Sequence, residues 1–401
     1  SQMSVSSSLQ CPVCRRENSA GRISCHACLS PLAGPGFVAP REALPFIRRG
    51  AMWGTLAAVA ALAGTLFVTP GSELSSLLGA SAAVEPEPST PAAAPPRPSH
   101  LAKFEPETGC YLGAYVLADI NISGRMERWV ELTGKGHASY LKYVGYGRPF
   151  PMDWAVAVRG HGAAPNIAFE PNNGLEEVED GEYLRAFARD AAKFGGPVFL
   201  RWASEMNGPW TNYHGNPRLY REKFRLVSRV MREEAPNVAM VWTPYCTPLR
   251  PIPDYYPGDD VVDWVGVNIY SVHHHDGSRH RPAHREDPAE LLRPVYELYA
   301  DRKPIQISEY ASTHFCKACG EYTADFAMNK MIRMYRSLPK QFPRVKMIYW
   351  FSWDTVSGKA AENNYAVTDD PVIRDTYRRL IAPDYFLSRM EPEESGVIQA
   401  E

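Results

Sequence analysis

The feature that most constrains the fold is a regular alternation that begins near residue 101. Short runs rich in Val, Ile and aromatic residues alternate there with longer amphipathic segments, the pattern of β-α units and a parallel sheet. Eight such units close a TIM barrel, and the length of this region suits one. We therefore predict an α/β protein with a (β/α)8 TIM barrel at residues 101–391. The predicted strands are 111–116, 140–144, 166–170, 198–203, 239–243, 264–270, 305–310 and 347–353.

Two predicted helix starts support the barrel. Asn216 and Asp287 each precede a proline, which places a capping side chain directly before proline at the first helical position. A doubly wound open sheet is the competing architecture. It is disfavoured because no glycine fingerprint follows the first strand.

The charge of the chain argues against one class of partner. Its 43 Lys and Arg nearly balance 45 Asp and Glu, giving a formal net charge of −2. Proteins bind nucleic acid largely because an excess of Lys and Arg neutralises phosphates and releases their counterions. This chain has no such excess, so we expect no nucleic-acid partner. The 9 Trp and 21 Tyr supply flat side chains that suit sugar binding, and equally a large core.

Two CxxC pairs lie near the start, at Cys11, Cys14, Cys25 and Cys28. Four thiolates at this spacing can bind a structural zinc ion. The segment has too few apolar residues to fold without such a bound ion. We predict a zinc ribbon at residues 8–35. Two disulfides or free thiols are the alternatives.

An uncharged, mostly apolar run at residues 51–68 is about the minimum length for a membrane-spanning helix. A secretory signal would lie nearer the start, and a core helix would show more of a polar face than Thr55 and Thr65 provide. We predict a transmembrane helix at residues 51–69.

Arginines before the apolar run predict its orientation. Arg41, Arg48 and Arg49 precede it, and the next cationic residue is Arg97. By the positive-inside rule the N-terminus is cytoplasmic, and the rest of the chain is periplasmic or at the cell surface. Residues 70–100 are rich in Pro and Ala and read as an extended linker. Zinc thiolates would then lie on the reducing side of the membrane.

Polar residues at the carboxyl ends of barrel strands are where catalysis is expected. Glu205 follows the fourth predicted strand and Glu309 lies in the seventh. Burying a Glu side chain within an apolar run costs free energy unless the carboxylate is paired with another group or has a function. Three strands apart on a closed barrel, the two can face each other, and a separation of roughly 5 Å suits retaining glycoside hydrolysis. The alternative is a structural pair bound to Arg201.

Three segments carry a family resemblance. RWASEMNGPW at 201–210, YYPGDDVVDWVGVNIY at 255–270 and PIQISEYAS at 304–312 resemble glycoside hydrolase family 26, in an order and spacing that covers residues 108–385. The resemblance implies a retaining endo-acting barrel enzyme that needs no cofactor for catalysis. Its substrates would be β-linked polysaccharides such as mannan, mixed-linkage glucan or β-1,3-xylan.

Residue roles follow from that resemblance by position. Glu205 would be the general acid/base and Glu309 the nucleophile. The implied substrate-binding set contains residues that would hydrogen-bond the nucleophile and aromatic residues that would stack on sugars: Arg201, Asn207, Trp210, Tyr270 and Trp353. One position departs from the family, which usually has His before the acid/base where this chain has Ser204. The sugar contact made there must change or pass through water.

Histidines and cysteines elsewhere leave alternatives open. The run at 273–275 is His-His-His, which can face solvent, line the sugar site or bind a metal. Cys316 and Cys319 can form a disulfide, whereas a second zinc site would need two further ligands. Cys110 and Cys246 are expected to be buried thiols, with a disulfide between them as the alternative.

Together these features predict a membrane-anchored retaining endo-β-glycosidase that acts on a polysaccharide of its own envelope, such as an exopolysaccharide, beside envelope or export machinery. The alternative is a non-catalytic barrel that binds polysaccharide or scaffolds an exopolysaccharide export system. The intact pair Glu205 and Glu309 argues against that alternative, and Ser204 keeps it open.

Overall fold

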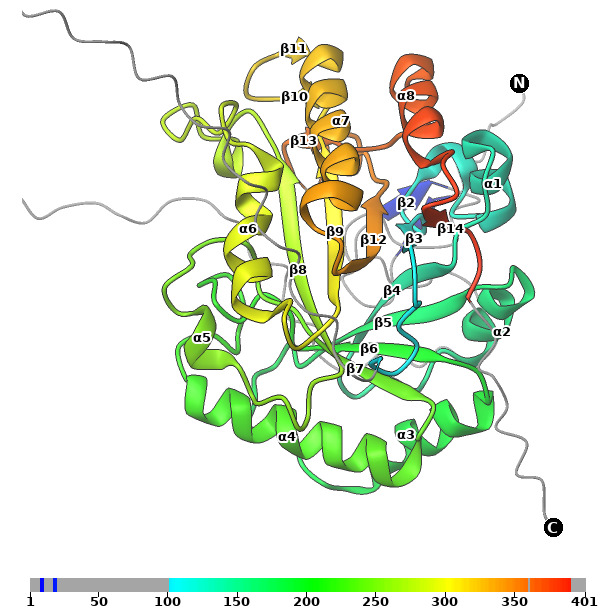
Figure 1. The fold of residues 1–401 in the computed structure, drawn as a ribbon, viewed down its shortest axis with the longest axis vertical. Coiled ribbons are helices and arrows are strands. Elements are labelled where there is room, and N and C mark those ends of the chain that lie inside the picture. The colour runs from blue at the N-terminus through cyan, green and yellow to red at the C-terminus, as the bar shows by residue number, and fades with distance from the viewer. Residues whose placement is uncertain (1–7, 11–16, 20–100, 360, 391–401) are drawn as a thin grey trace, which may run out of the picture.

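The computed structural model describes residues 8–10, 17–19, 101–359 and 361–390. Its centre is a closed barrel of eight parallel strands with helices around the outside (Figure 1). All eight predicted strands are confirmed, with ends that shift by up to two residues. They are β3 (Cys110–Tyr115), β4 (Ser139–Gly145), β5 (Ala164–Glu170), β6 (Val198–Trp202), β7 (Val238–Trp242), β8 (Trp264–Ser271), β9 (Ile305–Ser312) and β12 (Val345–Phe351).

The strands follow chain order around the barrel, and β12 closes it by pairing in parallel with β3. A short strand, β14 (Phe386–Leu387), pairs with the beginning of β3. At the carboxyl end of the barrel a separate three-stranded sheet has the order β11-β10-β13. Its strands are β10 (Phe315–Cys316), β11 (Glu321–Tyr322) and β13 (Asn363–Asn364).

A helix follows each barrel strand. The predicted caps are confirmed, because the side chain of Asn216 accepts from Leu219 N and that of Asp287 accepts from Ala289 N. The helices are α1 (Met126–Thr133), α2 (Met152–Gly160), α3 (Glu182–Phe194), α4 (Pro217–Glu234), α5 (Ile252–Tyr255), α6 (Pro288–Tyr299), α7 (Ala324–Gln341) and α8 (Pro371–Ile381), with 3-10 turns η1 (Ile120–Ile122) and η2 (His275–Gly277).

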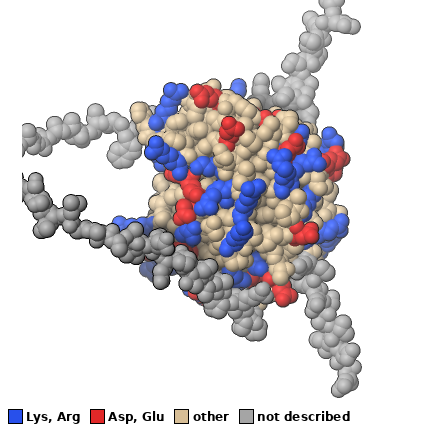
Figure 2. Space-filling model, turned by 45° about the horizontal axis from the view of Figure 1, so that its top comes forward, with Lys and Arg blue, Asp and Glu red and all other residues tan. Residues whose placement is uncertain are grey.

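One face of the barrel carries charged side chains of both signs among uncharged ones (Figure 2). On the face shown in Figure 2, Lys and Arg are interspersed with Asp and Glu. Mixed signs of this kind create no strong field of one sign over that face.

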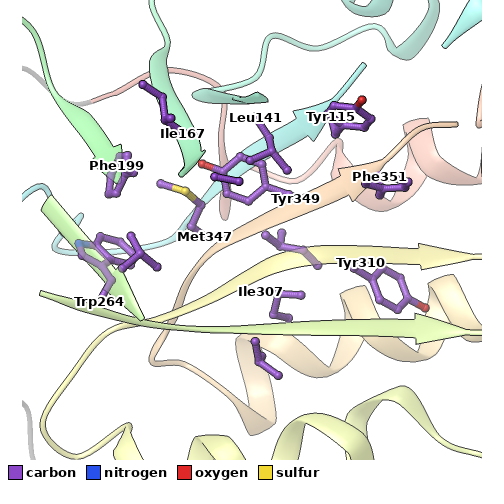
Figure 3. Close-up of a cluster of buried hydrophobic side chains, with 14 of the residues drawn as sticks. Tyr115, Leu141, Ile167, Phe199, Trp264, Ile307, Tyr310, Met347, Tyr349 and Phe351 are labelled. Carbon is purple, nitrogen blue, oxygen red and sulfur yellow. The ribbon is translucent and has the colours of Figure 1, made fainter. Parts of the chain in front are cut away.

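Apolar side chains fill the barrel because each strand is covered by helices outside and by facing strands inside. Figure 3 shows Phe199 and Met347 of two different strands, whereas Ile167 faces the surrounding helices because the amide of its neighbour Asn166 reaches across the interior to Gln306 and Tyr349. Gly113 in β3 has no space for a side chain, since a Cβ atom at this position would lie 2.3 Å from the ring of Tyr349. The Tyr349 hydroxyl donates to Ser139 Oγ at 2.6 Å, which satisfies its polar atom inside the core.

Near the N-terminus, β1 (Ser8–Gln10) and β2 (Glu17–Ser19) pair antiparallel. The predicted zinc ligands Cys11, Cys14, Cys25 and Cys28, the predicted membrane helix at 51–69 and the linker at 70–100 lie outside the described residues. Among the helices of the described residues, none combines the length and apolar character that crossing a bilayer requires.

Candidate active site

The backbone makes tight turns directly after β6, and these turns place Glu205 at the barrel mouth. Ala203 and Glu205 have φ values of 48° and 60°, in the left-handed region that residues with side chains rarely adopt. Neighbouring strands hold this geometry, because Ala203 N donates to Phe169 O and Glu205 N donates to Thr243 O. Strained backbone that its surroundings fix in this way is typical of functional sites.

Two side chains donate hydrogen bonds to the Glu205 carboxyl group. Asn268 Nδ2 donates to Oε1 at 2.8 Å, and Trp210 Nε1 donates to Oε2 at 2.5 Å. Burial, assisted by the negative charge of Glu309, raises the pKa of Glu205 from 4.5 to about 7. The group therefore exists in both protonation states near neutral pH, which is what a general acid/base requires.

Glu309 lies within β9 and is 5% exposed. Its Oε1 accepts from Arg201 Nη2 at 2.5 Å and from the Tyr143 hydroxyl at 2.5 Å, and its Oε2 accepts from the Tyr270 hydroxyl. The guanidinium balances the charge of the buried carboxylate, and the hydroxyls satisfy its remaining acceptor sites.

The environments of the two carboxyl groups differ in a way that separates their roles. Burial and the negative charge of Glu309 raise the pKa of the Tyr143 and Tyr270 hydroxyls well above their usual value, so both remain donors at neutral pH. Glu309 thus has a cation and two hydroxyls around it, whereas Glu205 has an amide and an indole. An ionised group beside a protonatable one is the arrangement of an acid/base and nucleophile pair.

The predicted contacts of Arg201 and Tyr270 with Glu309 are confirmed. Trp210 and Trp353 are both partly exposed. The Trp210 ring packs edge-on against Tyr245, with centroids 5.4 Å apart. Their stacking on sugars stays a prediction.

Asn207, which was predicted to bind substrate, bonds backbone groups of the protein, and a sugar contact stays a prediction. The side chain is fully buried, its amide donates to Tyr245 O and Pro248 O, and its Oδ1 accepts from Tyr245 N. Both amide hydrogens are therefore used by the backbone of the loop after β7. Asn207 thereby supports that loop.

Ser204, at the position that departs from the family pattern, is enclosed. Its hydroxyl is buried beside the Glu170 carboxyl group, whose pKa it acts to lower, without forming a well-aligned hydrogen bond. Its backbone N–H donates to Glu170 Oε2 at 3.0 Å, and its carbonyl accepts from the Tyr213 hydroxyl at 2.7 Å. The side chain is too short and too enclosed to replace an imidazole contact with sugar.

Three polar residues of the site were not predicted. Tyr143 contacts Glu309, Asn268 contacts Glu205, and Glu170 lies behind Ser204 with its Oε2 accepting also from Tyr213. Burial raises the pKa of Glu170, although the charge of Arg201 acts to lower it. Their positions carry a signal, because Glu170 ends β5 and Asn268 lies two residues before Tyr270, on the same face of β8.

The remaining histidines and cysteines have defined positions. Cys316 and Cys319 form a disulfide with Cα atoms 5.2 Å apart, which is one of the alternatives that the sequence left open. Cys110 and Cys246 are buried free thiols, as predicted. In the described residues, side chains able to bind a metal gather in one place, where His274 lies beside the CxxC pair.

Comparison with known proteins adds sequence evidence to this geometry. Residues 183–281, which contain Glu205, match the model of glycosyl hydrolase family 26. A β-1,3-xylanase, TXYA of Vibrio sp, is 38% identical over 114 residues, which is 26% of this chain and 24% of the xylanase. Endoglucanase H of Acetivibrio thermocellus is 22% identical over 295 residues, which is 68% of this chain and 30% of the endoglucanase.

The chain spans about a quarter to a third of the length of these curated relatives. A solved structure, the family 26 β-mannanase BoMan26A from Bacteroides ovatus, superposes with a TM-score of 0.50 at 12% identity, covering 72% of this chain and 94% of the mannanase. That likeness shows the fold. The matches to the family and its relatives support a glycosidase.

Proposed function

We propose that this glycoside hydrolase of the family 26 type is a membrane-anchored endo-β-glycosidase that cleaves a polysaccharide by double displacement, with net retention. The observation that carries the proposal is the unequal pair of carboxyl groups. Glu309 is buried among Arg201, Tyr143 and Tyr270, whereas Glu205 has its pKa raised to about 7.

In the first step the Glu309 carboxylate attacks the anomeric carbon while Glu205 donates its proton to the glycosidic oxygen. The carbon–oxygen bond to the leaving sugar breaks, and a covalent glycosyl-enzyme remains. In the second step Glu205, now ionised, takes a proton from water. The water oxygen attacks the anomeric carbon and forms a new carbon–oxygen bond while the bond from that carbon to Glu309 breaks, which returns both carboxyl groups to their starting states.

The proposed substrate is a β-linked polysaccharide, and the relatives indicate its range. Their names describe a β-1,3-xylanase, an endoglucanase and a β-mannanase. We include mannan, glucan, xylan and exopolysaccharide in the range. The departure at Ser204 argues against assuming mannose, because this chain lacks the imidazole that the family places before the acid/base.

The proposal includes an anchor at residues 51–69 with the barrel outside the cytoplasm, next to envelope or exopolysaccharide machinery. It rests on the uncharged run and on the preceding Arg41, Arg48 and Arg49. Reporter fusions at residues 45 and 100 test it. A cytoplasmic reporter signal at residue 100 would overturn both the orientation and the envelope role.

A structural zinc at Cys11, Cys14, Cys25 and Cys28 is also proposed, from four cysteines in two CxxC pairs. A peptide of residues 8–35 should bind one equivalent of zinc and lose its structure on chelation, because binding energy is folding energy at such a site. Structure retained without metal would contradict it.

The central test is the stereochemistry of hydrolysis. The full chain is incubated with a panel of xylans, glucans, mannans and the host's exopolysaccharide, and the anomeric configuration of early products is followed by NMR. Retained β configuration is the expected result. Inverted products would overturn the mechanism, because inversion needs carboxyl groups roughly 6.5–9.5 Å apart with a water between them. Binding without cleavage across the whole panel would favour the non-catalytic alternative.

A further inference from the structure

A histidine and two cysteines converge on loops at the carboxyl end of the barrel. His274 lies in the loop after β8, and Cys316 and Cys319 lie in the loop after β9. His274 Nδ1 is 3.5 Å from Cys319 Sγ and 3.8 Å from Cys316 Sγ. The residues are 42 and 45 positions apart in sequence, so the fold brings them together.

The cysteines occupy a tight hairpin that directs a backbone donor at sulfur. Cys316 pairs with Glu321 across β10 and β11, and Cys319 N donates to Cys316 Sγ at 3.2 Å. Gly320 completes the turn at φ 68°, a conformation that favours glycine. An N–H group directed at sulfur stabilises a thiolate, the form in which cysteine binds metals.

The histidine is held just as firmly. His275 N donates to Arg281 O at 2.9 Å and Ala283 N donates to His273 O at 2.8 Å, so two backbone hydrogen bonds flank His274. Its neighbours have other partners, since His275 Nε2 lies 2.8 Å from Glu286 Oε1 and the His273 ring packs on Phe326. Among the three histidines only His274 faces the sulfurs in this part of the structure.

The nitrogen–sulfur spacing matches the coordination sphere of zinc, and the two sulfurs, which are bonded in this structure, would separate on reduction. With Zn–S near 2.3 Å and Zn–N near 2.05 Å, a tetrahedral ion places nitrogen and sulfur ligands about 3.6 Å from each other. The two measured nitrogen–sulfur distances, 3.5 and 3.8 Å, lie on either side of that value. We propose that His274, Cys316 and Cys319 bind a zinc-class metal ion when the two cysteines are reduced.

Metal and disulfide exclude each other at this site. In the structure the two sulfurs are bonded. A thiol reductant supplies two electrons and two protons and converts the bond to two thiols. With a phosphine, the phosphine supplies the two electrons, and water supplies the protons and the oxygen of the phosphine oxide. The metal then displaces both thiol protons and takes the lone pair of neutral Nδ1. Three protein ligands leave a fourth position for water.

The two states would link the loops differently. The disulfide joins two residues of one hairpin, whereas the metal would also tie in the His274 loop after β8. That loop and the hairpin adjoin the active site, because β10 pairs with β13, and Tyr365, which follows β13, lies 5.3 Å from the ring of Tyr270. The metal would therefore brace the segment that supports Tyr270.

Metal stoichiometry of the full chain tests the proposal. Wild type and the variants His274→Ala, Cys319→Ser and His275→Ala are reduced with a phosphine without oxygen and titrated with Co²⁺ and then Zn²⁺. The N-terminal cysteines are present in all four proteins, so differences between proteins isolate this site. Wild type and His275→Ala should bind one equivalent more than Cys319→Ser, with thiolate-to-cobalt absorption of matching intensity.

His274→Ala should lower the affinity for that metal ion by more than about tenfold, because loss of even a residue that only hydrogen-bonds a metal ligand lowers metal affinity roughly 10–100-fold. Equal stoichiometry in reduced wild type and Cys319→Ser would overturn the proposal. So would an extra equivalent that persists in protein whose Cys316–Cys319 disulfide is verified by mass spectrometry.

A second measurement needs no variant and so does not depend on the folding of Cys319→Ser. Cys319 is partly exposed in the structure. In reduced wild type, added zinc should protect Cys319 from alkylation by iodoacetamide, as mapped by peptide mass spectrometry. Alkylation at an unchanged rate would contradict the metal site. Neither readout uses hydrolysis, so the proposal can fail while the proposed function holds.

Discussion

Tyr143 and Glu309 meet across the barrel mouth, where the tyrosine hydroxyl donates a 2.5 Å hydrogen bond to Oε1 of the carboxylate. Their strands, β4 and β9, are separated by β12 and β3 in the closed sheet. Closure of the barrel therefore brings the two strands together, and the Tyr143 hydroxyl bonds the same carboxylate oxygen as Arg201 Nη2, whereas Tyr270 donates to Oε2.

Replacing Tyr143 by Phe removes one donor to a charged acceptor. Such a hydrogen bond is worth about 1.5–3 kcal/mol, so kcat should fall roughly 10- to 150-fold with little change in KM. Tyr140→Phe is the matched control on the same strand, because its buried hydroxyl has no hydrogen-bond partner in the described residues. Steady-state kinetics measure kcat for both variants. An equal fall in kcat would show that Tyr143 acts only through packing.

Substitutions of the two carboxyl groups should impair different steps of turnover. Glu309→Ala removes the nucleophile and should abolish turnover of every substrate. Glu205→Ala should still form the glycosyl-enzyme from aryl glycosides with good leaving groups, which need no proton, and then stall. Azide should rescue Glu205→Ala with a β-glycosyl azide as product. Rescue of the Glu309 variant with that same configuration would reverse the assignment.

The raised pKa of Glu205 predicts the alkaline limb of the pH profile. Since the first step needs its protonated form, kcat/KM should fall about tenfold per pH unit above about 7. An alkaline limb that is unchanged in Glu205→Gln, measured on an activated aryl glycoside, would assign this pKa to another group.

The same shift has a consequence for stability. A carboxyl group with a raised pKa in the folded state favours folding at low pH, and this contribution is lost as pH rises from 4.5 to about 7. Glu205→Gln should therefore be more stable than wild type at pH 8 by up to about 3 kcal/mol, and the difference should vanish near pH 4. Urea unfolding at the two pH values measures it, and equal stability at pH 8 would contradict the shift.

The enclosed hydroxyl of Ser204 predicts a mild phenotype. Ser204→Ala removes a buried hydroxyl that lies beside the Glu170 carboxyl group without a well-aligned hydrogen bond. The free energy of unfolding should stay unchanged or rise by about 1 kcal/mol, and kcat/KM should remain within about twofold of wild type. A large rise in KM would show that this hydroxyl reaches the sugar.

Asn207→Ala should destabilise the fold, because it leaves the buried carbonyls of Tyr245 and Pro248 without their donor. A loss of about 2–4 kcal/mol is expected from thermal or urea unfolding. Asn212→Ala, at an exposed asparagine that bonds Asn172 O, should change stability by less than about 0.5 kcal/mol. If Asn207→Ala is as stable as wild type but has a raised KM, the result would support the predicted contact of Asn207 with the sugar.

The barrel could be predicted because its strands are buried on both faces and so appear as continuous apolar runs. Glu205 and Glu309 were visible for the same reason, as charges inside such runs. Tyr143 could not be predicted, because nothing in the sequence shows which of the 21 tyrosines contacts Glu309, which lies 166 residues away. The bonds of Asn207 to the loop after β7 could not be predicted, because an amide can bond a loop or a sugar equally well and only the fold decides which acceptors it meets.

The hydrogen bond from the Trp210 indole to Glu205 Oε2 also gives the enzyme an internal reporter. Under the proposed mechanism Glu205 loses its proton in the first half of each turnover and regains it in the second, so the charge beside the indole changes twice. Tryptophan emission is sensitive to a charge at that distance. Stopped-flow fluorescence, with Trp210→Phe as the blank, would thus time glycosylation and deglycosylation separately on an unlabelled polysaccharide.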